Sequence, residues 1–98
     1  MMFYMVEIEL PEDPDIQFYQ LIPAQKAHVD KLMEDGSIRQ YALSHDRSRL
    51  WIIALGSEEA EIWDMLAAFP MIAFMKPKVT PLMFADSMES MLPSFSLN

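Results

Sequence analysis

The chain has 98 residues, of which 52% are apolar and 22% charged, so it is long enough for one domain with one hydrophobic core and too apolar for intrinsic disorder. Its formal charge of −8 argues against binding to nucleic acid or to an anionic membrane, since both require a basic surface. The chain has no cysteine, which excludes disulfides, thiolate catalysis and zinc–thiolate sites, and no run of about 20 apolar residues that would span a membrane. We therefore expect a soluble, cytoplasmic protein.

Residues 2–10 predict the first strand. The side chains near its start are apolar on both faces, with Tyr4 and Val6 on one face and Phe3 and Met5 on the other. Such a pattern is typical of a central strand, which is covered on both sides.

A helix is predicted next, with Asp13 as its N-cap and Pro14 at its first position. Pro23 predicts a kink or a restart, because proline lacks the N–H that a helix interior needs. The helical pattern then continues to Asp35, and Gly36 is a good terminator.

Residues 37–44 and 49–56 predict two strands, which the polar residues 45–48 join as a hairpin. The second of these strands is apolar on both faces and is expected to be central. The first carries Arg39 and Gln40 and is expected to lie at an edge of the sheet.

The remaining elements are a helix that Ser57 caps and Pro70 ends, and a last strand that contains Pro77 and Pro81. These two prolines are four residues apart, so their missing N–H groups fall on the same side of the strand. That side cannot pair with a neighbour, which predicts an edge strand.

The element order is therefore βαββαβ, with two central and two edge strands. Right-handed crossovers give one antiparallel sheet of order 4-1-3-2 with both helices on one face, a ferredoxin-like α+β sandwich. Because the central strands are apolar on both faces, we expect a homodimer whose free sheet faces pack together. Residues 1–85 form this domain, and the tail of residues 86–98 either frays or clasps a neighbouring subunit.

Gln25 and His28 place polar groups on or beside the stripe of the first helix that should face the sheet. They either border a pocket for a small-molecule ligand or lie at the margin of the stripe, solvated or bonded to backbone. His28 is the best candidate general base, since a free imidazole titrates near about pH 6.5.

Several other residues are candidates for substrate binding. Arg39, Arg47 and Arg49 could hold a substrate carboxylate, because guanidinium groups bind carboxylates in a bidentate manner, or they could pair with carboxylates of the chain itself. Tyr4, Tyr41 and Trp51 could line a pocket, or they could belong to the core, where aromatic residues of strands usually lie.

Other patterns in the sequence favour structural roles. The adjacent His45 and Asp46 resemble a base and its orienting carboxylate, but turn chemistry explains the pair as well. The acidic start of the second helix is a solvated helix end, so we predict no metal site. With Gly36 and Gly56 as the only glycines, a glycine-rich phosphate loop is excluded.

The closing segment LAAFPMIAFMKPKVTPL resembles that of muconolactone isomerases, which has the form L-x-x-L-P-L-F-P-Y-M-x-x-x-V-T-P-L. The segments IPAQKAHVDKLMEDG and LSHDRSRLWII are also similar to those of small proteins grouped with this domain, and the resemblance covers residues 2–84. The matching positions of the closing segment are Leu66, Pro70, Phe74, Met75, Val79, Thr80, Pro81 and Leu82.

The resemblance implies a dimeric α+β barrel, often assembled into larger rings. It also implies a reaction of aromatic catabolism that moves a double bond in an unsaturated lactone by proton transfer beside a carbonyl, without metal or organic cofactor. At one place the chain departs from the family, because Gln25 precedes Lys26 where the isomerases have an acidic residue, and an amide cannot exchange a proton near neutral pH.

The leading hypothesis is therefore a cofactor-free, isomerase-like enzyme for an unsaturated lactone or a related small carbonyl compound. In it, His28 is the acid/base, Gln25 polarises the carbonyl, and Arg39, Tyr4, Tyr41, Trp51 and Phe74 bind substrate. The alternative is a catalytically inactive module of the same fold that binds a small molecule or serves assembly. A cofactor-independent oxygenase on the same dimeric fold is a third hypothesis.

Overall fold

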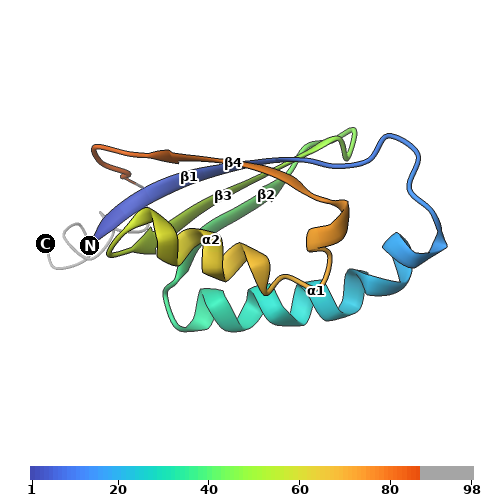
Figure 1. Ribbon diagram of the computed structural model, residues 1–98, viewed down its shortest axis with the longest axis horizontal. Coiled ribbons are helices and arrows are strands. Elements are labelled where there is room, and N and C mark those ends of the chain that lie inside the picture. The colour runs from blue at the N-terminus through green and yellow to red at the C-terminus, as the bar shows by residue number, and fades with distance from the viewer. Residues whose placement is uncertain (87–98) are drawn as a thin grey trace, which may run out of the picture.

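One antiparallel sheet carries both helices on the same face in a computed structural model that describes residues 1–86 (Figure 1). The strand order is β2-β3-β1-β4, which confirms the predicted order 4-1-3-2 and the ferredoxin-like α+β sandwich. The elements are β1 (Met2–Glu9), α1 (Ile16–Glu34), β2 (Ile38–Leu43), β3 (Arg49–Gly56), α2 (Glu59–Ala67), the 3-10 helix η1 (Ile72–Phe74) and β4 (Lys76–Pro81).

The two faces of the sheet differ in burial. On the helix side, Val6 of β1 and Ile52 of β3 are fully buried against Leu66 of α2, and they form the centre of the core. On the other side, β1 and β3 pair Met5 with Ile53, both of which stay partly exposed. The register places five apolar side chains together on this uncovered surface, here called the free face: Phe3, Met5, Trp51, Ile53 and Leu55.

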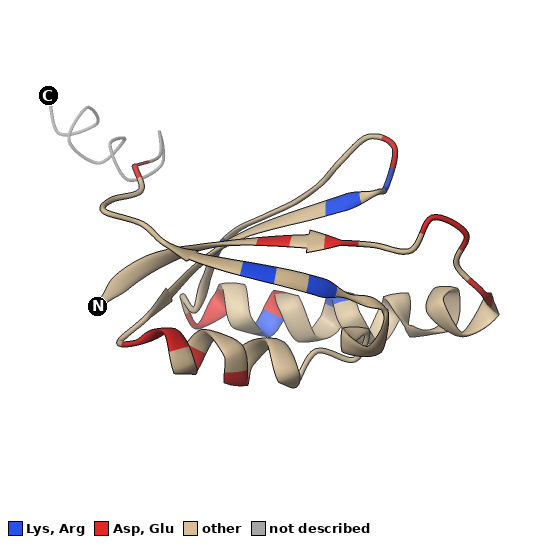
Figure 2. Cartoon of the chain, turned by 45° about the horizontal axis from the view of Figure 1, so that its top comes forward, with Lys and Arg blue, Asp and Glu red and all other residues tan. Residues whose placement is uncertain are grey.

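Strand β4 lies at the edge of the sheet, as its prolines predict. Pro77 is in register with Ile8 and Pro81 with Tyr4, so the prolines share one side of the strand and β1 pairs with the other. Acidic residues of β1 lie beside basic residues of β4 (Figure 2), where the register joins Glu7 with Lys78. Opposite charges at such cross-strand positions favour this register.

Helix α1 begins two residues later than expected. Its N-cap is Asp15, whose carboxylate accepts a hydrogen bond from the Phe18 backbone N–H at 3.1 Å, so the prediction of Asp13 as the cap is wrong. The helix also runs through Pro23 as one element, without the predicted restart. Burial of Gln25 and Val29 beyond the proline anchors that half of the helix to the sheet, which offsets the lost backbone bond. Gly36 ends the helix region with φ of +85°, as expected.

Helix α2 is capped differently from the prediction. Its N-cap is Glu58, which makes no side-chain capping bond, so Ser57 is not the cap. Instead, the Glu61 carboxylate accepts a hydrogen bond from the Ser57 backbone N–H at 2.8 Å, which places an acidic group at the positive end of the helix.

Residues 1–86 contain neither a helix that is long and apolar enough to cross a membrane nor a cluster of three or more His, Cys, Asp and Glu side chains that could hold a metal ion. The predicted tail of residues 86–98 lies, from residue 87 onward, outside the described residues.

Candidate functional site

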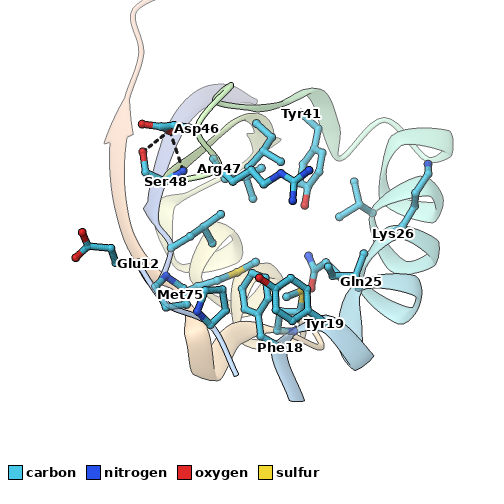
Figure 3. A pocket seen from close by; sticks show the side chains of 18 of the residues that line it. Glu12, Phe18, Tyr19, Gln25, Lys26, Tyr41, Asp46, Arg47, Ser48 and Met75 are labelled. Carbon is cyan, nitrogen blue, oxygen red and sulfur yellow. Dashed lines mark hydrogen bonds between the residues drawn. The ribbon is translucent and has the colours of Figure 1, made fainter. Parts of the chain in front are cut away.

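A cavity of about 1050 Å³ lies between α1 and the sheet (Figure 3). Its walls come from α1, the loop after β1, strands β2 and β3, and the segment around η1. The carboxylates and cations lie mainly at its rim. The apolar and aromatic lining comprises Leu10, Pro11, Pro14, Phe18, Tyr19, Ile22, Val29, Met33, Tyr41, Leu43, Leu50, Met71 and Met75.

Gln25 is the one buried polar or charged residue in the described chain, with 4% of its surface exposed. Its Oε1 accepts a hydrogen bond from the Met71 backbone N–H at 3.1 Å, which fixes the orientation of the amide. Its Nε2 is buried without a hydrogen-bond partner among residues 1–86. A buried donor without a partner costs about 1–3 kcal/mol, and a ligand oxygen that reached Nε2 would remove this cost.

Tyr41 reaches the same cavity from β2. Its hydroxyl points toward the Gln25 amide (Figure 3). Burial raises the pKa of the Tyr41 phenol, and the nearby Gln25 side chain lowers it in part. The phenol therefore stays protonated near neutral pH and can donate a hydrogen bond into the cavity.

The hairpin loop between β2 and β3 holds Arg47 beside the cavity. Asp46 accepts hydrogen bonds from the Ser44 hydroxyl at 2.8 Å, the Ser48 hydroxyl at 2.7 Å and the Ser48 backbone N–H at 3.0 Å. These bonds lower the pKa of Asp46 to about 2. The loop accommodates Arg47 at φ of +64°, an unusual backbone conformation, and the guanidinium extends toward Tyr41 (Figure 3).

The remaining charged groups of the rim point away from the cavity or pair with each other. Lys26 forms a salt bridge with Asp30 at 3.2 Å on the outer surface of α1. Glu12 has no hydrogen bond or salt bridge within the described residues, and its carboxylate is directed away from the cavity (Figure 3). Inside the cavity, the polar groups are thus mainly donors, from Gln25, Tyr41 and Arg47.

The comparisons with known proteins agree with this architecture. A family model described as muconolactone delta-isomerase matches residues 2–87. The chain belongs to this family. Among solved structures, it is similar to a crystal structure of muconolactone isomerase at 3.3 Å resolution, with 21% sequence identity and a TM-score of 0.71, over 88% of this chain and 93% of that chain. At this identity the likeness shows the fold, and the comparison with curated proteins found no match.

Within this muconolactone-isomerase fold, the two residues predicted as catalytic lie apart. Gln25 lines the large cavity, whereas His28 borders a smaller one of about 340 Å³ between α1, α2 and β3. The His28 ring packs edge-on against Phe69, with ring centroids 5.7 Å apart. His28 therefore does not line the cavity in which Gln25 would meet a carbonyl.

Of the predicted substrate-binding residues, Tyr41 lines the cavity and the others do not. Arg39 lies over the Phe3 ring, with its Cζ 5.8 Å from the ring centroid, and Trp51 belongs to the free face. Tyr4 is buried in the core. The Phe74 ring packs edge-on against that of Phe18, with centroids 5.5 Å apart, and Phe18 does line the cavity.

Of the three arginines that the sequence offers for a substrate carboxylate, Arg47 lines the cavity, whereas Arg49 lies 3.9 Å from Glu9. Arg47 has a left-handed backbone conformation that its residue type does not indicate. The Met71 N–H that holds Gln25 comes from a segment 46 positions away, and a single sequence carries no signal for such a contact.

Proposed function

We propose that the chain is a cofactor-free, isomerase-like enzyme that transfers a proton beside the carbonyl group of an unsaturated lactone or a related small compound. Membership in the muconolactone delta-isomerase family supports the reaction class. The observation that carries the proposal is Gln25, whose buried Nε2 has no partner in residues 1–86 and borders the cavity.

In this proposal the Gln25 amide and the Tyr41 hydroxyl bind the carbonyl oxygen. Removal of a proton from a carbon whose charge is conjugated with the carbonyl, beside it or beyond the double bond, places negative charge on that oxygen, as an enolate. Two fixed donors stabilise this charge more strongly than they stabilise the neutral ground state, which lowers the barrier to reaction. Return of the proton to another carbon of the conjugated system completes the shift of the double bond.

We assign the proton transfer to Glu12 in place of His28. Glu12 lines the cavity without a hydrogen bond or salt bridge within the described chain, whereas His28 lies at another cavity. Its carboxylate points outward, but an exposed side chain changes rotamer within nanoseconds, so it can turn toward a bound substrate.

Proton transfer can be tested with muconolactone in D₂O, followed by NMR. We expect the protein to remove the ring proton beyond the double bond, to incorporate deuterium at the carbon beside the carbonyl and to shift the double bond. Glu12→Gln should slow the incorporation of deuterium and the shift of the double bond at least about 100-fold, because the amide cannot carry a proton. Asp13→Asn removes a neighbouring carboxylate that does not line the cavity, and it should leave both rates unchanged. Equal losses in the two variants would contradict the role of Glu12.

A specific observation favours a second candidate function, a binding module without catalysis. The carboxylates that line the cavity are directed outward or bonded elsewhere, with Asp30 paired to Lys26 and Asp46 bonded within its own loop. Such a cavity can bind a carbonyl compound without removing a proton from it. Saturable binding of muconolactone without deuterium exchange would support the module and contradict the enzyme.

The same proposal includes assembly through the free face and a cytoplasmic location. Five partly exposed apolar side chains on the free face support a homodimer in which two sheets pack face to face. The reaction class, a step of aromatic catabolism, supports the cytoplasm. Recovery of the protein from another cell fraction would contradict this location.

A further inference from the structure

The cavity is large, and most of its lining is apolar, with Gln25 and Tyr41 as the polar groups that would bind a carbonyl. Its volume of about 1050 Å³ lies just above the range of about 300–1,000 Å³ that is typical of small-molecule sites. A single-ring lactone would fill a small part of this space and would leave most of the apolar walls in contact with water. The shape therefore favours a larger ligand, whose burial would remove that apolar surface from water.

The apolar walls continue to the mouth of the cavity. Tyr19, Ile22, Met33 and Leu43 all line it and are 48%, 43%, 43% and 52% exposed. Exposed apolar side chains gathered around a cavity are typical of a ligand site, and methionine adapts its shape to flat rings. Beside them, the Phe18 and Tyr19 rings pack edge to face, with centroids 5.5 Å apart.

The charges at the rim argue against a strongly anionic ligand. Three carboxylates, of Glu12, Asp30 and Asp46, line the cavity beside two cations, of Lys26 and Arg47. Lys26 is already paired with Asp30. The five charges sum to −1, so the rim as a whole does not attract a strong anion, and the groups inside the cavity are the donors of Gln25, Tyr41 and Arg47. A neutral molecule whose polarity is concentrated in one acceptor group fits both features.

We propose that the site binds a neutral, fused-ring aromatic carbonyl compound. Its carbonyl oxygen accepts hydrogen bonds from Gln25 Nε2 and the Tyr41 hydroxyl, and its rings lie against the apolar walls around Ile22 and Met33. This inference deepens the proposed function and rests on it for the identity of the carbonyl-binding groups. It is tested by binding alone, so its outcome does not depend on turnover.

Three probes distinguish the contribution of the hydrogen-bond donors from that of the apolar walls: coumarin, furan-2(5H)-one and naphthalene. Coumarin has both the fused rings and the lactone carbonyl, furan-2(5H)-one has the lactone without the aromatic ring, and naphthalene has the rings without an acceptor. We expect titration by NMR to give coumarin a Kd at least about tenfold lower than either of the others. Equal affinity for furan-2(5H)-one would contradict the role of the apolar walls, and equal affinity for naphthalene would contradict the role of the donors.

The polar contact can be observed without a variant. The side-chain NH₂ signals of Gln25 should shift on addition of coumarin and stay in place on addition of naphthalene. A coumarin complex that leaves these signals unmoved would overturn the placement of the carbonyl.

The apolar contact is tested by two variants of α1. Ile22→Asn places a polar group in the wall and should weaken coumarin binding about tenfold. Ile16→Asn makes the same change at a 67% exposed residue of the same helix that does not line the cavity, and it should leave the Kd unchanged. Equal losses in the two variants would contradict this site.

The two proposals fail in different ways. Tight coumarin binding without proton exchange on muconolactone would contradict the proposed enzymatic function and support the proposed ligand class. Proton exchange on muconolactone, together with coumarin binding no tighter than that of furan-2(5H)-one, would support the enzymatic function and contradict the ligand class.

Discussion

Gln25 Oε1 accepts a hydrogen bond from the Met71 backbone N–H at 3.1 Å, across 46 positions of the sequence. This bond joins α1 to the segment between α2 and η1, and it uses the acceptor of the amide while leaving the donor Nε2 free among the described residues. The oxygen of the Gln25 side chain thus holds the two segments together, and its nitrogen is the atom that we propose for ligand binding.

Replacement of Tyr41 by phenylalanine tests the second donor of the proposed site. Tyr41→Phe keeps the ring and removes the hydroxyl that points toward Gln25. We expect kcat for muconolactone to fall about 10- to 100-fold, because one of two donors to the enolate oxygen is lost. The measurement is a steady-state assay of the isomerised product, with circular dichroism to establish that the variant is folded.

His28→Ala changes a residue that lines the smaller cavity, and it serves as a comparison for Tyr41→Phe in the large one. Because His28 packs on Phe69 away from the Gln25 cavity, we expect kcat to stay within about twofold of the wild type. A loss of about 100-fold in kcat with an unchanged fold would instead restore His28 as the general base that the sequence suggests.

The fold was predictable from the sequence because local signals agreed with one another. Pro77 and Pro81 identified an edge strand, and the strand of residues 49–56 was predicted with the bounds that the structure has. The caps were less predictable, since Asp13, Asp15 and Ser57 are all residue types that cap helices and tertiary packing decides among them.

The site was predictable only in part. Gln25, Tyr41 and Arg47 were identified as candidates, and all three line the large cavity. Arg39 and His28 have suitable chemistry but lie elsewhere, because helix rotation and a register shift in β2 next to Arg39 decide which surface a side chain reaches. A periodicity of 3.6 residues places Gln25 and His28 near one stripe and does not resolve which of two adjacent cavities each one lines.

Gln25→Glu tests the buried amide as a donor to the substrate oxygen. A glutamate keeps an oxygen that can accept from the Met71 N–H, and it replaces the Nε2 donor with a second carboxylate oxygen. Such an oxygen offers no N–H to the enolate and, when ionised, repels its negative charge. We expect the rate of deuterium incorporation from D₂O during the reaction of muconolactone to fall at least about tenfold. An unchanged rate in a folded variant that still binds muconolactone would contradict this expectation.

Asp46→Ala tests the loop that positions Arg47. The pKa of Asp46 is lowered to about 2 in the folded protein by its bonds with Ser48 and Ser44, below the ordinary value near about 3.9 of an unfolded chain. A lowered folded pKa contributes stability that is present above the unfolded pKa and is lost as the pH falls through the folded pKa. We therefore expect Asp46→Ala to lower the Tm by a few degrees at pH 7 and to have a smaller effect near about pH 2. His45→Ala, in the same loop, removes none of the bonds to Asp46 and should leave the Tm at pH 7 unchanged.

Ile53→Asp tests assembly through the free face. Ile53 lies opposite Met5 in the middle of that face, so packing of a second sheet there would bury the new carboxylate without a partner. We expect the wild type to show the mass of a dimer or a larger oligomer in light scattering, and the variant to dissociate at least about 100-fold more readily. Ile16→Asp introduces the same charge on the exposed side of α1 and should leave the mass unchanged. A wild type that is monomeric in dilute solution, or a variant that keeps the wild-type mass, would show that the free face is not the interface between subunits.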